Sequence, residues 1–125
     1  MQLHGLLLYV RDLEESVRFY CDLLGLTVVA RPAPHMAVVR VGSSVLYLHG
    51  DPDDLPEWMK AALSGKQRSV GTILHLQVAD VDQMHRELLA KGAPISLGPV
   101  DQPYGQRHLY LYDPDGYNVV IMQPI

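Results

Sequence analysis

The sequence predicts a single α+β domain, residues 1–125, made of two βαβββ modules that form a cupped, half-barrel mixed sheet. Three observations carry this prediction: an internal near-repeat, a helix-start signal in each copy, and strict alternation of side chains in the segments that follow. Residues 6–29 and 74–95 both contain a strand pattern, then Val-x-Asp, an amphipathic helix pattern, Gly and another strand pattern. A solenoid needs at least about three repeats, so two copies indicate a duplicated supersecondary unit.

Each copy contains one helix with a clear beginning, buried face and end. The helices begin at pairs with capping-box spacing, which satisfy free N–H groups: Asp12 with Glu15, and Asp80 with Gln83. The buried faces carry apolar side chains at helical spacing, namely Leu13, Val17, Tyr20 and Leu24, and then Val81, Met84 and Leu88. Gly25 and Gly92 end the helices, because glycine adopts a left-handed backbone at little cost.

The remaining segments complete two modules joined by a linker. Module one covers 1–50, with strands at its start and at 26–31, 36–42 and 44–49. Residues 51–70 are a linker that contains one short helix near Glu57–Leu63. Module two covers 71–125, with strands at 72–79 and near 93–97, 106–112 and 117–123. We therefore expect two four-stranded sheets, each covered by one helix and concave on its other face.

Composition excludes several classes of protein. Hydrophobic residues make up 48% of the chain and charged residues 19%, with a net charge of −4. A nucleic-acid binder would carry a basic patch, and the basic residues here are scattered. No apolar run reaches the roughly 18 residues of a membrane span, and the N-terminus lacks signal-peptide features. The single cysteine excludes an internal disulfide, and we expect a cytoplasmic protein.

Strand alternation separates the two faces of each sheet. One side of every strand is aliphatic and is assigned to the helix. The other side carries aromatic and polar residues: Tyr9, Arg40, Tyr47, His49, His75, Gln77, His108, Tyr110, Asn118 and Met122. An aromatic concave wall with a few polar groups is typical of a small-molecule pocket. The alternative is a dimer interface or a solvent-facing sheet.

Three stretches of the sequence resemble one known family: "VRDLEESVRFYCDLLGL", "VADVDQMHRELLAKG" and "PYGQRHLYLYDPDGYNVVIMQ". With the paired βαβββ order, they resemble the vicinal oxygen chelate superfamily of glyoxalase, bleomycin-resistance and dioxygenase proteins. The resemblance covers nearly the whole chain. It implies the fold, but no single activity, because this fold hosts many.

The resemblance also implies where metal ligands would lie. Metal-dependent members place a histidine seven residues before the Asp that begins each helix, which here gives Gly5 and Ile73. A carboxylate follows the "DPDG" turn, which gives Val120, and the fourth position falls near Tyr47. His4 is one residue out of register. These positions argue against glyoxalase I and extradiol dioxygenase chemistry, and we expect neither a metal nor another cofactor.

The cavity histidines leave three alternatives open. His49 and His75 lie two residues beyond emptied ligand positions and can meet across a pocket. They form a displaced metal site with His108, or supply a general base, or bind through hydrogen bonds only. The last interpretation is favoured. His35 and His85 are expected at the surface without partners.

Metal-free resistance-type binders of this family grip flat aromatic ligands by stacking, in pockets formed by a dimer. Tyr104 and Trp58 join the tyrosines of the cavity as stacking candidates. The structural alternatives are that Tyr104 and Arg107 fix their loop and that Trp58 anchors the linker helix. We expect a homodimer that binds a small aromatic molecule in a metal-free cavity. The competing hypotheses are a lyase-, isomerase- or dioxygenase-like enzyme, and a regulatory or structural protein with a filled cavity.

Overall fold

The computed structural model describes residues 1–125, which divide into two compact units, Met1–Gly65 and Lys66–Ile125. The boundary falls inside the segment expected as a linker. The short helix α2 (Glu57–Leu63) has the predicted bounds and belongs to the first unit. The guanidinium of Arg11 donates to the carbonyls of Leu63 and Gly65 and so ties the end of this helix to the segment after the first strand.

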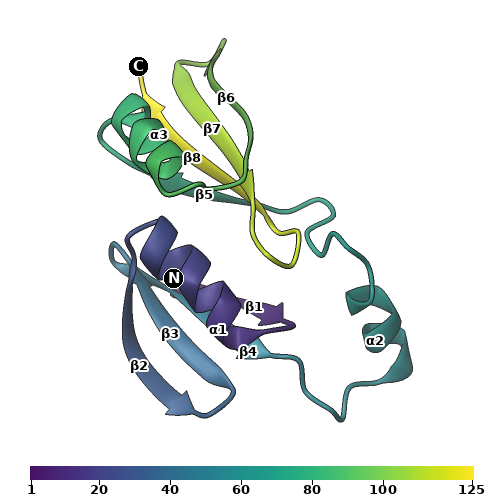
Figure 1. The fold of residues 1–125 in the computed structure, drawn as a ribbon. Coiled ribbons are helices and arrows are strands. Elements are labelled where there is room, and N and C mark those ends of the chain that lie inside the picture. The colour runs from purple at the N-terminus through teal and green to yellow at the C-terminus, as the bar shows by residue number, and fades with distance from the viewer. The chain divides into compact units, whose positions relative to one another are not determined.

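The first unit is an open four-stranded mixed sheet with a helix on one face (Figure 1). Its strands lie in the order β1 (Gly5–Val10), β4 (Ser44–Gly50), β3 (Met36–Val41) and β2 (Thr27–Ala33). The β1–β4 pair is parallel and the other pairs are antiparallel. Helix α1 (Leu13–Val17) continues directly as the π-helix η1 (Arg18–Leu23).

The second unit repeats this arrangement. Its sheet order is β5 (Ile73–Gln77), β8 (Asn118–Pro124), β7 (Gln106–Tyr112) and β6 (Ile95–Gln102), with helix α3 (Val81–Ala90) beside it (Figure 1). Here β5 and β8 are parallel. The predicted α+β fold of paired modules is thus confirmed. Strand β6 is longer than expected and runs on to Gln102.

The helix signals are confirmed in part. Asp12 accepts from the N–H of Glu15 at 3.1 Å, and Asp80 accepts from that of Gln83 at 3.0 Å. The second capping box is not reciprocal, because the Gln83 side chain donates to Glu87 one turn later instead. Gly25 and Gly92 end the helices at φ 79° and 72°, as predicted.

Packing of the first helix departs from a regular α-helical pattern. Tyr20 and Leu24 are buried as predicted, but Leu13 and Val17 are only half-buried. Phe19 is buried instead, next to Tyr20. The π-helical turn that begins at Arg18 widens the helix and shifts the phase of its buried face. In α3, Val81 and Leu88 are buried, whereas Met84 is half-buried.

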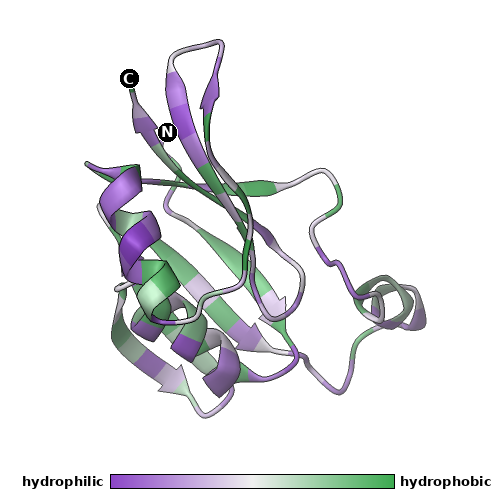
Figure 2. Ribbon diagram, turned by 45° about the horizontal axis from the view of Figure 1, so that its top comes forward, coloured by the Kyte–Doolittle hydropathy of each residue, from purple (hydrophilic) through white to green (hydrophobic).

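The aliphatic strand positions form the core beneath each helix, and Figure 2 shows hydrophobic stretches along the strands. The buried members are Leu8, Val10, Ala37, Val39, Leu46 and Leu48 in one sheet and Leu109, Leu111, Val119 and Ile121 in the other. Val41, Leu74, Leu76 and Val78 are half-buried. Leu6 is 40% exposed and lies near the start of an edge strand.

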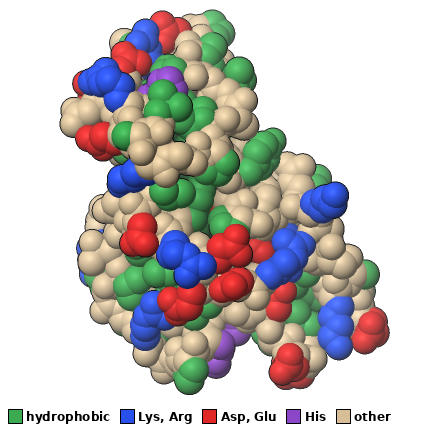
Figure 3. Space-filling model, viewed as in Figure 1, with side chains coloured by type: hydrophobic (Ala, Val, Ile, Leu, Met, Phe, Trp, Pro, Cys, Tyr) green, Lys and Arg blue, Asp and Glu red, His purple; other side chains and the backbone are tan.

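On the face drawn in Figure 3, acidic and basic side chains are intermixed rather than gathered by sign. No helix is long and apolar enough to span a bilayer.

Candidate functional site

The second unit brings three predicted site residues, His75, Tyr104 and Tyr110, around a fourth, His108. Its ring centroid lies 5.5 Å from that of His75, 5.9 Å from Tyr104 and 5.6 Å from Tyr110, in each case with the rings tilted edge to face. Strand register explains the grouping, since Val120 of β8 pairs with His75 on one side and Tyr110 on the other. Val120 itself is 1% exposed. Strand β8 therefore supplies an apolar floor between two polar aromatic side chains.

A directional chain of hydrogen bonds fixes His108. The amide of Gln102 donates to the Tyr110 hydroxyl oxygen at 3.1 Å, and that hydroxyl lies 3.0 Å from His108 Nδ1. His108 Nε2 lies 2.8 Å from Gln106 Oε1, which only accepts. With this assignment of the Gln106 amide, Nε2 carries the proton and Nδ1 accepts from Tyr110. Both ring nitrogens are satisfied.

His108 is only 2% exposed. Burial lowers the pKa of His108, and the neighbouring His75 lowers it further. The imidazole is therefore neutral at pH 7 and already fully hydrogen-bonded. Such a group orients its neighbours and does not act as a free base.

The other predicted residues of the second unit lie around this cluster. Met122 pairs with His108 in the sheet and is buried, whereas Gln77 lies exposed on the edge strand β5. Asn118 is half-buried, and its backbone N–H donates to the Ser69 hydroxyl at 2.8 Å. Sequence reasoning missed Gln102 and Gln106. Sequence reasoning could have identified Gln106, because this residue lies two residues before His108 on the same strand face.

In the first unit the predicted residues form two separate groups. Tyr9 and His49 make an edge-to-face contact with centroids 5.5 Å apart, and His35 lies 4.7 Å from His49. Tyr47 instead bonds His4, with 2.8 Å between the hydroxyl and Nε2. The expectation that His35 lacks a partner is wrong, because the β3–β4 register brings the turn before β3 beside the end of β4.

Two further candidates of the first unit lie apart from these groups. Arg40 is exposed on β3, and Trp58 is 70% exposed on α2. Trp58 therefore does not anchor its helix by burial. The anchoring contact comes from Arg11, which bonds the carbonyls at the end of α2.

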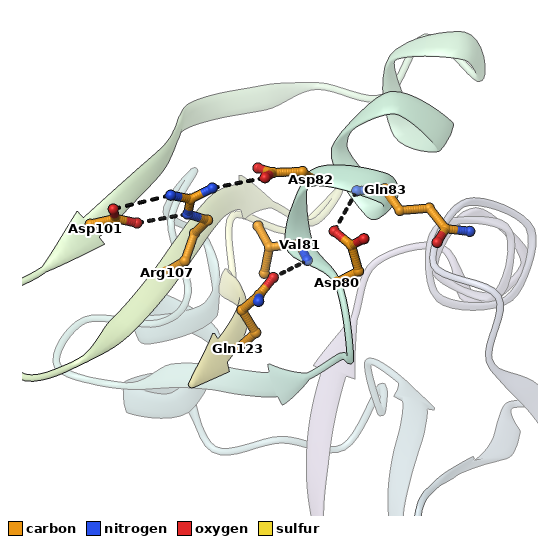
Figure 4. A network of polar contacts seen from close by, with 7 residues as sticks. All are labelled: Asp80, Val81, Asp82, Gln83, Asp101, Arg107 and Gln123. Carbon is orange, nitrogen blue, oxygen red and sulfur yellow. Dashed lines mark hydrogen bonds and ion pairs between the residues drawn. The ribbon is translucent and has the colours of Figure 1, made fainter. Parts of the chain in front are cut away.

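Arg107 lies on the helix side of the second sheet (Figure 4). Its guanidinium binds both carboxylate oxygens of Asp101, at 2.7 and 3.1 Å, and also Asp82 at the start of α3, at 2.8 Å. The two carboxylates raise the pKa of Arg107, and Arg107 holds the pKa of Asp101 below its usual value. These contacts fasten the β6–β7 hairpin to α3, which is the structural role favoured for Arg107.

The positions where the resemblance implies metal ligands do not fit a divalent ion. Ile73 and Val120 have aliphatic side chains without donor atoms. A Cβ atom at Gly5 would lie 2.3 Å from the carbonyl oxygen of Val45, so this position accepts no side chain at all. Tyr47 is engaged by His4. A donor set of two histidines and carboxylates cannot be assembled from these four residues.

Comparison with known proteins identifies the family of this chain. The sequence profile of the Glyoxalase/Bleomycin resistance protein/Dioxygenase superfamily matches residues 2–121. An uncharacterized protein of Mycolicibacterium smegmatis is 30% identical over 118 residues, which cover 94% of this chain and 90% of that protein.

Two solved structures share the fold. TnmS3, an antibiotic binding protein from Streptomyces sp. CB03234, has a TM-score of 0.75 and 25% identity, covering 100% of this chain and 97% of that one. A glyoxalase/dioxygenase from Nostoc punctiforme has a TM-score of 0.72 and 24% identity, covering 99% and 91% of the two chains.

Proposed function

The chain belongs to the Glyoxalase/Bleomycin resistance protein/Dioxygenase superfamily, and from this premise we propose that it binds a small, flat organic molecule. The binding surface is the aromatic face of the second sheet, and binding needs no catalytic metal. The observation that carries the proposal is the buried, neutral His108, locked between Gln106 and Tyr110. Such a rigid buried centre holds the neighbouring exposed rings of His75 and Tyr104 in place, and these rings form the surface on which a ligand stacks.

Two side chains next to His108, those of His75 and Tyr104, are accessible to a ligand. His75 and Tyr104 are both exposed, and each makes one edge-to-face contact with the His108 ring. Their remaining ring surfaces offer stacking for a planar π-system, and each aromatic pair contributes about 0.5–1.5 kcal/mol beyond area burial. Similarity to an antibiotic binding protein supports the same class of function.

A screen of flat ligands tests the proposal. Purified protein is titrated by calorimetry with naphthalene-, phenanthrene- and anthraquinone-based compounds and with a non-planar aliphatic control of equal mass. We expect saturable binding of a planar compound with no chemical change in it, and weaker binding after Tyr104→Ala and His75→Ala. His85→Ala is the matched control, since α3 packs on the other side of the sheet. Equal binding by all variants would refute this location.

An enzyme without a metal is the second candidate, and one observation favours it. The hydrogen bonds of the structure leave both ring nitrogens of His75 open, next to a neutral histidine. His75 would then be a general base or acid. Product formation by mass spectrometry, lost in His75→Gln but not in His85→Gln, would establish turnover and displace the pure binder. We also propose a homodimer, which light scattering of the purified chain tests.

A further inference from the structure

A second pair of histidines, His35 and His49, lies in the first unit at the end of β4. The backbone N–H of Gly50 donates to the carbonyl of His35 at 2.8 Å, which holds the turn before β3 against the end of β4. The two imidazole centroids are 4.7 Å apart as a result. Main-chain pairing thus brings the two residues side by side, and their side chains turn toward each other.

The tautomer of His49 is fixed by its neighbour. Nδ1 of His49 lies 2.7 Å from the carbonyl oxygen of Gly50, and a carbonyl only accepts. Nδ1 therefore carries the proton, and the lone pair of Nε2 is available. Metal-binding histidines are oriented in this way, with the non-ligating nitrogen donating to a carbonyl or carboxylate.

The same histidines line a cavity of about 510 Å³, one wall of which carries negatively charged side chains. The loop after β4 contributes Asp51, Asp53 and Asp54 to the lining, and no Lys or Arg is part of it. Carboxylates concentrate cations near the imidazoles, and they supply oxygen ligands when the loop adjusts. In the structure no group of three or more His, Cys, Asp or Glu side chains is placed to hold an ion, so the two imidazoles act with water and loop oxygens.

We propose that His35 and His49 bind a divalent transition-metal ion. Two imidazoles with oxygen ligands suit Zn²⁺, Ni²⁺ and Cu²⁺, whereas Ca²⁺ and Mg²⁺ take oxygen ligands. This site uses residues other than the ligand positions that the resemblance implies, which are Gly5, Tyr47, Ile73 and Val120. It goes beyond the proposed function and does not depend on it, because its metal is not part of the aromatic cluster around His108.

The test is a metal titration of untagged, chelator-stripped protein by calorimetry, with Zn²⁺, Ni²⁺ and Cu²⁺ and with Ca²⁺ as the oxygen-only control. We expect one site per chain, and a rise in Kd of about tenfold or more after His35→Ala or His49→Ala. Loss of an outer-shell partner alone costs about 10–100-fold, so loss of a ligand costs at least as much. His85→Ala, in the second unit, should leave the affinity unchanged.

A second measurement does not rely on variants. In ¹H–¹⁵N spectra of the unaltered protein, substoichiometric Cu²⁺ should broaden the imidazole signals of His35 and His49 before those of His75 and His108. Uniform broadening, or binding that survives both substitutions, would overturn the proposal. A Ca²⁺ affinity equal to that for the transition metals would show that the acidic loop binds the ion, and it would overturn the proposal as well.

Discussion

Replacement of Tyr110 by Phe removes one hydroxyl and breaks two hydrogen bonds at the centre of the candidate site. That hydroxyl accepts from Gln102 at 3.1 Å and reaches His108 Nδ1 at 3.0 Å. Because His108 is 2% exposed, water does not readily replace the lost donor. A buried polar atom left without its partner costs about 1–3 kcal/mol. We expect the free energy of unfolding to fall by about that amount, out of a typical total of about 5–15 kcal/mol.

Urea unfolding followed by circular dichroism measures this loss. Tyr112→Phe is the matched control, because Tyr112 lies on the same strand face but is 44% exposed, and its change should stay within about 0.5 kcal/mol. The ¹⁵N shifts of the His108 ring give a second readout and should show a proton on Nε2 in the unaltered protein. A loss in Tyr110→Phe no larger than in the control, with a proton on Nδ1, would refute the hydrogen-bond chain.

Two further predictions concern buried ionisable side chains. Folding lowers the pKa of His108, so this side chain binds protons more readily in the unfolded chain than in the folded one. The contribution of neutral His108 to the free energy of unfolding is therefore complete above about pH 6.5 and is lost as the pH falls. The difference in unfolding free energy between pH 7.5 and pH 5.5 should therefore be smaller in His108→Gln than in the unaltered protein. An equal difference would contradict the lowered pKa of His108. Arg68 and Asp115 form an ion pair at 3.9 Å with side chains 2% exposed, so Arg68→Met should cost about 3–5 kcal/mol in urea unfolding, and adding Asp115→Asn should restore part of it. If Arg68→Met lowers the free energy of unfolding by less than about 1 kcal/mol, the ion pair contributes no more than a solvent-screened surface pair, and the prediction is wrong.

Local signals in the sequence predicted most of the fold. Alternation assigned Leu109 and Leu111 to the helix side and His108 and Tyr110 to the other, because a strand has a period of two whatever surrounds it. Asp12 and Asp80 marked the helix starts through a hydrogen bond that spans three residues. Such features depend on a few neighbouring residues, so they can be read without knowledge of the tertiary structure.

Features that depend on the exact course of the backbone were not predicted. The strands at 36–42 and 44–49 were expected, but the contact between His35 and His49 also requires their exact register and the hydrogen bond from Gly50 to His35. The burial of Phe19 requires a π-helical turn, which has no reliable sequence signal. In both cases the missing information was the position of the backbone and not the chemistry of the side chains.

The same distinction applies to the positions where the resemblance implies metal ligands. Val120 lacks a donor by side-chain type alone, and a single substitution would provide one. Gly5 lacks room as well, since the carbonyl of Val45 lies 2.3 Å from where its Cβ would be. The β1–β4 pairing opposite Val45 must therefore shift before a histidine fits. The lack of room at Gly5 is thus built into the strand pairing of the first sheet, whereas the aromatic cluster around His108 is formed within the second unit alone.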